Sequence, residues 1–244
     1  MTTSPSSVHL VTGASAGMGE AVVQALADRG DMVVAAARRG DALAALATGR
    51  PTIVPVTADV GTRDGRDRIV AAVRDAGEGP IASVVHGAAT PVALEPWDEL
   101  DADTLTAHFH VHVAAAIALT SELHRTCGVD RCVIFDSYSA STPRVGWSAY
   151  SILKAAAQMA FRAAAAELDG VAVARVYPGA VATPLLDRVL GAPRSIDATG
   201  VYHELNDTGR VSTAAEIAEQ LLALLDLDPA ALAAEDTWMI GHPA

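Results

Sequence analysis

An apolar strand, a glycine-rich turn and a helix follow one another near the start of the chain, and this order constrains the fold more than any other feature. The strand is expected at residues 8–12, and Gly13, Gly17 and Gly19 lie in the turn TGASAGMG that comes next. Gly13 permits the turn itself, while the missing side chains at Gly17 and Gly19 let the backbone approach a ligand and let the helix pack on the sheet. Any tight turn can use glycines, but a helix N-terminus at this junction also supplies N–H donors and partial positive charge. The turn therefore predicts a binding site for a pyrophosphate.

Strands and helices alternate through the rest of the chain. Residues 32–37 form a continuous apolar run, which is typical of a strand buried on both faces. Further strands are expected at 52–55, 82–86, 132–136, 172–176 and 237–240, and helices at 17–29, 41–47, 63–76, 101–124, 148–168 and 213–225. This alternation predicts an α/β fold of the Rossmann type, a doubly wound parallel sheet with right-handed crossovers and helices on both faces.

Length and composition indicate a single domain that spans residues 1–244. With 244 residues, 51% of them hydrophobic, the chain is long enough for one well-filled core. Residues 1–7 are polar, and we expect them to form a flexible leader rather than a signal peptide. The least regular stretch, residues 191–210, belongs to a segment (185–210) that we expect to act as a lid over a substrate.

Charge and cysteine content argue against several classes of protein. A net charge of −12 without a basic stripe argues against a nucleic-acid partner. The longest uncharged apolar runs, such as residues 113–119, are far shorter than the ~20 residues that span a bilayer, so no membrane association is expected. Cys127 and Cys132 lie five apart, which is typical of neither a redox motif nor a zinc site. We interpret them as reduced thiols in a cytoplasmic protein.

The residues at the end of the second expected strand indicate which dinucleotide fits. A carboxylate at this point accepts hydrogen bonds from the adenine ribose hydroxyls, but the chain has Ala36 and Ala37, followed by Arg38 and Arg39. Arginine suits a 2′-phosphate by its charge and its bidentate geometry, so we predict NADP(H) in preference to NAD(H). The alternative interpretation is a pair of solvated loop arginines. Asp59 follows the third strand, where it either meets an adenine edge or is an ordinary acid at a helix N-terminus.

A phenol and an ammonium lie one helical turn apart at Tyr150 and Lys154. A free phenol has a pKa near ~10, and a neighbouring ammonium together with an oxidised nicotinamide ring is expected to lower it. Tyrosine can then donate a proton to a developing alkoxide or accept one from an alcohol. Ser137 ends the fifth expected strand, at the edge where ligands bind in open α/β sheets, and can orient a carbonyl. Ser139 and Ser141 are its rivals, and a serine that only caps the next turn is the alternative for each.

These residues resemble those of the short-chain dehydrogenases/reductases, over essentially the whole chain. The resemblance implies that Tyr150 and Lys154 are the catalytic pair and that Ser137 is the catalytic serine. The segment PGAVATP resembles the one that closes over the nicotinamide, where Val181 gives backbone contacts and Thr183 a hydroxyl. The implied cofactor contacts are Gly13, Ser15, Ala16, Gly17, Met18, Gly19, Arg38, Arg39, Asp59, Val60, Gly87, Ala88, Tyr150, Lys154, Pro178, Gly179, Val181 and Thr183.

The chain departs from the family pattern at two histidines. His86 begins a stretch HGAA where the family usually has Asn-Asn-Ala-Gly. His112 matches an asparagine that holds a water linked to the lysine, and a neutral imidazole can hold the same water as part of the proton relay. Because histidine titrates near neutrality, the relay is expected to be pH-sensitive. His108 and His112 have a spacing that can bind a metal, but no acid or cysteine joins them in a visible pattern, so no metal is expected.

Within the family, residues 194–225 resemble sepiapterin reductases and their bacterial relatives that reduce benzil-type diketones. Glu235 and Asp236, before the last strand, are the acids nearest to the place where sepiapterin reductases anchor a pterin. The resemblance implies an NADPH-dependent reductase of a ketone or diketone, in which Tyr150 protonates the oxygen. The expected substrate pocket includes Tyr138, Ser139, Arg144 and Trp147.

Two other functions remain open. One is an alcohol dehydrogenase that works in the oxidative direction with NAD(P), and the other is a cofactor-binding regulatory protein with impaired catalysis. The two expected long helices are rich in alanine, which allows close packing, and family members commonly pair these helices between subunits. We therefore expect a homodimer or homotetramer.

Overall fold

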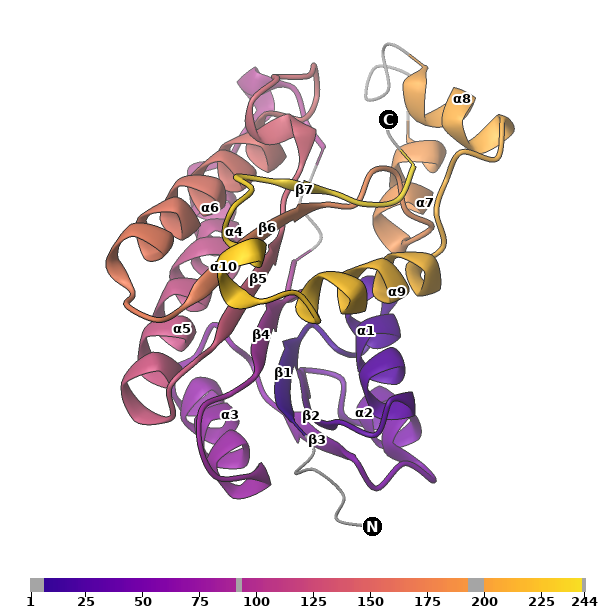
Figure 1. The fold of residues 1–244 in the computed structure, drawn as a ribbon. Helices are drawn as coiled ribbons and strands as arrows, with labels where there is room; N and C mark the ends of the chain where they lie inside the picture. The colour runs from indigo at the N-terminus through magenta and orange to yellow at the C-terminus, as the bar shows by residue number, and fades with distance from the viewer. Residues whose placement is uncertain (1–6, 91–93, 193–199, 243–244) are drawn as a thin grey trace.

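Seven parallel strands form one continuous sheet at the centre of the molecule (Figure 1). The computed structural model describes residues 7–90, 94–192 and 200–242. The strands lie in the order β3-β2-β1-β4-β5-β6-β7. They are β1 (Val8–Thr12), β2 (Met32–Ala37), β3 (Ile53–Thr57), β4 (Ser83–His86), β5 (Arg131–Phe135), β6 (Ala172–Tyr177) and β7 (Trp238–Met239). The chain winds outward from β1 to β3 and then outward again from β4 to β7, so the sheet is doubly wound with its switch point between β1 and β4.

Helices cover both faces of the sheet, as the alternation predicts. In Figure 1, α3, α5 and α6 lie on one face, and α1, α2 and α9 lie on the other. The α-helices are α1 (Gly17–Asp28), α2 (Gly40–Ala47), α3 (Arg63–Ala76), α4 (Ala102–Phe109), α5 (Ala115–Thr126), α6 (Ser148–Glu167), α7 (Pro184–Gly191), α8 (Val201–Asp207), α9 (Ala214–Leu225) and α10 (Pro229–Leu232). Short helical turns occur at η1 (Trp97–Glu99), η2 (His110–Ala114, a π-turn) and η3 (Tyr138–Ala140).

Alternate residues of the strands feed two separate cores. Leu10 of β1 packs with the apolar side chains of α3, α5 and α6, such as Ile69 and Leu119. Its neighbour Val11 packs with those of α1 and α9, such as Leu221. Because successive side chains of a strand point to opposite faces, a continuous apolar run such as MVVAAA in β2 can fill both layers at once.

The largest difference from the expected elements concerns the helix at residues 101–124. It is three pieces: α4, the π-turn η2 and α5, which ends at Thr126. A π-turn inserts one residue into a helix and so shifts the direction in which later side chains point. The His110 ring nitrogen Nε2 lies 2.6 Å from the Gly61 carbonyl oxygen, and this contact holds the turn against the loop after β3. The turn positions Val111 and His112 toward the cavity described below.

Other boundaries move by a few residues for identifiable reasons. β3 runs through Pro55 to Thr57 rather than stopping at residue 55. It is an edge strand that pairs only with β2, and an edge strand tolerates a proline. The stretch 191–210 contains a regular helix, α8, which we did not expect. Residues 193–199 of the expected lid and 1–6 of the expected leader lie outside the described residues.

No helix within the described ranges combines the length and the apolar character needed to cross a bilayer.

Candidate active site

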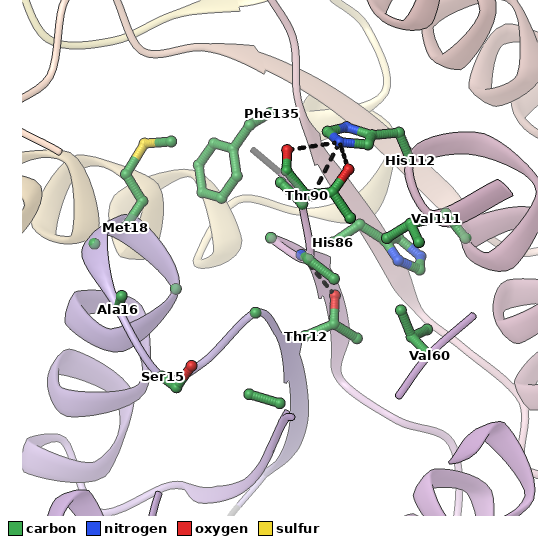
Figure 2. Close-up of a pocket in the computed structure, with 18 of the residues that line it drawn as sticks. Thr12, Ser15, Ala16, Met18, Val60, His86, Thr90, Val111, His112 and Phe135 are labelled. Carbon is green, nitrogen blue, oxygen red and sulfur yellow. Dashed lines mark hydrogen bonds between the residues drawn. The ribbon is translucent and has the colours of Figure 1, made fainter. Parts of the chain in front are cut away.

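A cavity of about 550 Å³ opens at the carboxyl ends of the strands, over the switch point of the sheet. Figure 2 shows the turn that carries Ser15 and Met18 on one side of it, and Val60 and Val111 on the other. Most of the residues expected at the site line this cavity: Gly13, Ser15, Ala16, Gly17, Met18, Gly19, Arg38, Arg39, Asp59, Val60, Gly87, Ala88, His112, Tyr150, Lys154 and Thr183. Side chains from segments far apart in the sequence therefore meet in one place.

The glycines of the first turn are required by close backbone contacts. Gly13 has a φ of +69°, and a Cβ there would lie 2.3 Å from the Gly87 carbonyl oxygen. A Cβ at Gly19 would lie 2.5 Å from the Gly13 carbonyl oxygen, so α1 can start this close to the turn only with glycine. Gly17, with a φ of +59°, faces Thr183. The turn thus leaves bare backbone at the N-terminus of a helix, which suits a phosphate group.

The two arginines after β2 lie at the far end of the cavity and are exposed. Arg39 donates from Nε to the Ser15 hydroxyl at 3.1 Å and from a terminal nitrogen to the Ser15 carbonyl at 2.7 Å. Arg39 is therefore tied to the glycine turn, which argues against the alternative of two solvated loop arginines for this residue. The Arg39 guanidinium is thus placed beside Ser15, and Arg38 also lines the cavity.

Asp59 and Val60 lie on the opposite wall of the cavity. The Asp59 carboxylate accepts a hydrogen bond from the Gly61 N–H at 2.9 Å. The cap of α3 is the Thr62 side chain, so Asp59 is not the N-terminal cap of this helix. Val60 is buried, and Val111 from the π-turn lies on the same side of the cavity (Figure 2).

Tyr150, Ser137 and Lys154 come together beside the end of β5. The Tyr150 and Ser137 hydroxyls are hydrogen-bonded to one another. The Lys154 ammonium donates to the Phe135 carbonyl oxygen at 2.7 Å and lies 5.6 Å from the centre of the Tyr150 ring. Lys154 is also the only lysine in the chain. The two residues one helical turn apart thus point toward the serine that we expected to join them.

Burial shifts the pKa of both groups toward their neutral forms. It raises the pKa of Tyr150 to about 12, although the hydrogen bond with Ser137 opposes this. Burial lowers the pKa of Lys154 to about 8, and the negative charge of Asp136 opposes this. The expected lowering of the phenol pKa concerns the complex with an oxidised nicotinamide and stays a prediction, whereas in the protein chain alone burial dominates. Tyr150 is consequently protonated at neutral pH and able to donate.

His112 is held by Thr90 (Figure 2). Its Nε2 accepts a hydrogen bond from the Thr90 N–H at 3.0 Å and lies 3.1 Å from the Thr90 hydroxyl, which also contacts His108. Burial, together with the charge of Lys154, lowers the pKa of His112 to about 4. The expectation that His112 titrates near neutrality is therefore wrong, and the imidazole is neutral there. Within the described ranges, no group of three His, Cys, Asp or Glu side chains is suited to a metal.

His86 supports the floor of the cavity. Its Nε2 lies 2.8 Å from the Thr120 hydroxyl, and its ring packs against Phe161. Burial lowers its pKa to about 4, so it too is neutral at physiological pH. The next residue, Gly87, has no room for a side chain, because a Cβ there would lie 2.7 Å from the Thr12 carbonyl oxygen. Ala88 donates its N–H to the Thr12 hydroxyl at 3.2 Å.

The segment after β6 reaches the cavity with only part of its expected contacts. Thr183 lines the cavity next to Gly17, but Pro178, Gly179 and Val181 are not among the lining residues. Gly179 is required by the C-terminal segment, since a Cβ there would lie 2.1 Å from the His242 carbonyl oxygen. Val181 forms a parallel bridge with Ser212 in which residues 180 and 182 make the hydrogen bonds. Its own N–H points to the other side, away from Ser212.

The expected substrate pocket is changed most by the structure. Ser139 is buried and donates its backbone N–H to the Ser137 hydroxyl, so it positions Ser137 and is not among the residues that line this cavity. Trp147 is also buried: its ring stacks on Tyr202 of α8 at 5.4 Å and meets Tyr150 edge-on. The Arg144 guanidinium lies over the Tyr202 ring, 5.3 Å from the ring centre. Tyr138 is exposed.

Sequence reasoning missed several residues of the site. Thr90, Val111 and Arg188 line the cavity, and Tyr202 covers Trp147. Asp136 and Gln158 form a buried polar contact behind Ser137 and Lys154. A signal was present for these two, because Asp136 immediately precedes Ser137 and Gln158 continues the spacing of Tyr150 and Lys154.

Comparisons with known proteins agree with this arrangement. Residues 7–192 match the family model described as short chain dehydrogenase. Bovine (Bos taurus) sepiapterin reductase is 27% identical over 238 residues, which cover 90% of this chain and 89% of that protein. Human (Homo sapiens) L-xylulose reductase is 31% identical over 182 residues, 72% of each chain. A solved structure of the KRED1-Pglu enzyme superposes with a TM-score of 0.85, at 24% identity, over 96% of this chain and 100% of that one. The protein belongs to the short-chain dehydrogenase/reductase family of oxidoreductases, as the glycine turn, Tyr150 and Lys154 indicate.

Proposed function

We propose that this protein is an NADPH-dependent reductase that converts a ketone or diketone carbonyl to an alcohol. The observation that carries the proposal is the protonated, buried phenol of Tyr150, hydrogen-bonded to Ser137 and adjacent to Lys154 at the edge of the cavity. A reductase needs a proton donor at this point, and the raised pKa keeps the donor protonated through the neutral range.

The cavity fits a dinucleotide phosphate. The cradle at Gly13, Gly17 and Gly19 has room for a pyrophosphate only because no Cβ fills it. Arg39, fixed on Ser15, and the adjacent Arg38 supply positive charge where an adenine ribose would end. These arginines support NADP(H) over NAD(H), since a 2′-phosphate accepts charge-assisted bidentate bonds. When bound, the reduced nicotinamide supplies the hydride.

The residues of this chain then perform the proton chemistry. The Ser137 hydroxyl orients the substrate oxygen toward Tyr150, and Tyr150 donates its proton to that oxygen. Lys154 stabilises the resulting phenolate through its positive charge and holds a ribose hydroxyl of the cofactor. Val181 and Thr183 contribute the backbone and hydroxyl contacts to the carboxamide, with Pro178 and Gly179 shaping the segment. His112 accepts the Thr90 N–H and so fixes Thr90. In this scheme His112 also holds a relay water near Lys154.

The substrate side is apolar and aromatic. Trp147 meets Tyr150 edge-on, Tyr202 stacks on Trp147, and Arg144 lies over the Tyr202 ring. We expect the exposed Tyr138 to contribute as well. Such a surface suits a moderately hydrophobic carbonyl compound. Of the expected lid at residues 185–210, the described parts are α7 and α8, and we expect these two helices to cover the substrate. The similarity to a sepiapterin reductase supports reduction as the direction of the reaction. The two free cysteines support a cytoplasmic location.

The test is NADPH oxidation with a panel of ketones and diketones that includes benzil and sepiapterin. We expect turnover with at least one of them, and loss of that turnover in Tyr150→Phe, which should still bind NADPH. Tyr138→Phe is the matched control, because it removes a phenol near the site that donates no proton in this scheme. Turnover that survives in Tyr150→Phe contradicts the proposal.

Two results would favour the other functions. Oxidation of alcohols with NAD, together with weaker binding of NADP, would indicate a dehydrogenase that works in the oxidative direction. Tight NADPH binding without any turnover would indicate a regulatory protein.

We also propose that the protein is a homodimer or homotetramer that pairs its long helices between subunits. Exposed apolar side chains on α5 and α6 support this, as argued in the Discussion.

A further inference from the structure

A polar stripe runs along one face of α6. Tyr150, Lys154, Gln158 and Arg162 follow one another at intervals of four residues, so they lie on the same side of the helix. Tyr150 contacts Ser137, and Lys154 contacts the Phe135 carbonyl oxygen. The next two members of the stripe continue away from the cavity toward two carboxylates, Asp136 and Asp236.

Asp136 is a buried carboxylate directly behind the reactive groups. It is 5% exposed, and its Oδ1 accepts the Ser137 N–H at 2.7 Å. Its Oδ2 accepts from the Gln158 amide at 3.0 Å and from the Arg175 guanidinium at 3.3 Å. A buried carboxylate is costly unless it is paired and hydrogen-bonded, and Asp136 meets both conditions.

The ion pair of Asp136 and Arg175 is connected to the surface. Arg175 of β6 is 3% exposed, and its other terminal nitrogen forms an ion pair with Asp236. Asp236 is exposed and also binds Arg162 at 2.6 Å. Asp136 therefore has a single buried cationic partner among the described residues, and that partner is shared with a second carboxylate.

The charge of Asp136 acts on both titrating groups of the site. It opposes the lowering of the Lys154 pKa, and it contributes to the raised pKa of Tyr150. Both effects favour the protonated form. Other charged or titratable groups lie near this pair on the neighbouring elements. His112 of η2 acts on Lys154 and has His108 of α4 beside it. Tyr177 of β6 acts on Tyr150 and has Tyr138 and Arg144 near it.

We propose that Asp136 is a positioning residue that keeps the proton on Tyr150 and the charge on Lys154, and thereby favours the proton-donating state that carbonyl reduction requires. It also fixes the backbone of Ser137 through its N–H. The inference rests on the proposed function for its consequence in catalysis, but its electrostatic part concerns Lys154 and Tyr150 alone.

The single lysine of the chain makes a direct test possible. Protein labelled with ¹³C at the lysine Cε gives one side-chain NMR signal, which reports the protonation of Lys154. In Asp136→Asn, which keeps the size of the side chain and an oxygen that can accept the Ser137 N–H, we expect the pKa of Lys154 to fall by about one unit. The matched control is Asp236→Asn, which removes the other carboxylate on Arg175 and should leave that pKa unchanged.

A second readout concerns the reaction. In Asp136→Asn the decline of the reductive kcat at high pH should move to lower pH, whereas a purely structural defect would lower kcat at all pH values. Should Asp136→Asn fail to fold because Arg175 is left unpaired, the double variant Asp136→Asn/Arg175→Met removes both buried charges, and the pKa of Lys154 should still fall.

The outcomes separate the two proposals. An unchanged Lys154 pKa in a folded Asp136→Asn variant overturns the inference, as do equal shifts in Asp136→Asn and Asp236→Asn. If the wild-type protein has no reductase activity, the proposed function fails, yet the NMR titration still decides whether Asp136 holds the charge on Lys154.

Discussion

At the scale of single residues, Arg39 makes the cofactor preference testable. Its guanidinium is already fixed on Ser15, so little side-chain freedom is lost when an anion binds there. We expect Arg39→Ala to raise the Kd for NADPH about tenfold and to leave the Kd for NADH nearly unchanged. Fluorescence titration with both cofactors measures this. Arg63→Ala is the control, because Arg63 is an exposed arginine outside the cavity. Equal losses for NADPH and NADH would show that Arg39 does not contact a 2′-phosphate.

The contact between His112 and Thr90 predicts different results for two substitutions. An asparagine at this position can accept the Thr90 N–H, so His112→Asn should keep its stability and its activity. His112→Leu leaves that N–H without its acceptor, and we expect a loss of about 1–3 kcal/mol in the free energy of unfolding. Denaturant unfolding at neutral pH measures both. Because the pKa of His112 is about 4, the pH–rate profile of His112→Asn should match the wild type near neutrality. A wild-type transition near neutrality that disappears in His112→Asn would contradict this.

The chemical identity of the site residues was predictable, but the environment of each was not. Residue type and spacing identify Tyr150, Lys154 and Ser137, because the reaction requires those groups at the end of a strand and on the next helix. Ser139 looked equivalent to Ser137 in sequence, yet its side chain is buried. The burial of Trp147 depends on Tyr202, more than fifty residues away, and no local pattern reports such a contact.

At the scale of elements, the turn between β1 and α1 predicts a steric effect at Gly19. This residue is helical, so only space matters: a Cβ would lie 2.5 Å from the Gly13 carbonyl oxygen. We expect Gly19→Ala to destabilise the protein by about 1–3 kcal/mol and to weaken cofactor binding at least tenfold. Gly191→Ala in α7 is the matched control, since nothing lies within 4 Å of its Cβ and alanine favours the helix. Thermal unfolding and NADPH titration of both variants make the comparison, and similar behaviour of the two would refute the role assigned to the turn.

Helices and strands were predicted well where the local sequence pattern shows which of their faces are buried. β2 and α3 illustrate this, because a continuous apolar run and an amphipathic period each have one solution in such a sheet. The π-turn in 101–124 was not predictable in the same way. It is stabilised by contacts of His110 with Gly61 and of His112 with Thr90, which depend on the position of two distant loops. The doubly wound parallel sheet was predictable from the alternation of strands and helices.

At the scale of the whole molecule, three histidines link folding to pH. The pKa values of His86 and His112 are lowered to about 4, and that of His9 is also lowered, in each case mainly by burial. The unfolded chain binds a proton on each near its ordinary pKa of about 6.5, whereas the folded chain does not. Stability is therefore complete above pH ~6.5 and is lost progressively as the pH falls toward about 4.

The slope of this loss can be measured for one histidine. Each such group contributes up to about 1.4 kcal/mol per pH unit to the free energy of unfolding between these limits. In His86→Gln, which can still bond the Thr120 hydroxyl, the slope should be smaller by nearly that amount. Urea unfolding at a series of pH values gives the slope. An unchanged slope in His86→Gln would mean that His86 titrates normally in the folded protein.

The outer face of α4, α5 and α6 carries the prediction about assembly. Phe109, Ile117, Ile152 and Met159 are large apolar side chains exposed on these helices, which lie on the same side of the sheet (Figure 1). Alanines surround them on α6, so the helix of a second copy can approach closely. A stable interface buries roughly 800 Å² on each partner, and paired long helices can supply that area.

We expect the protein to be a dimer or tetramer by light scattering at micromolar concentration. Met159→Glu places a charge in the proposed interface, where it would be desolvated without a partner, and should shift the protein toward the monomer. Ala44→Glu, on the exposed surface of α2 across the sheet, should leave the oligomeric state unchanged. A monomeric wild-type protein would contradict the prediction, and it would leave the four apolar side chains to some other partner. Dissociation in Ala44→Glu as well as in Met159→Glu would point to a general effect of added negative charge on a chain whose net charge is already −12.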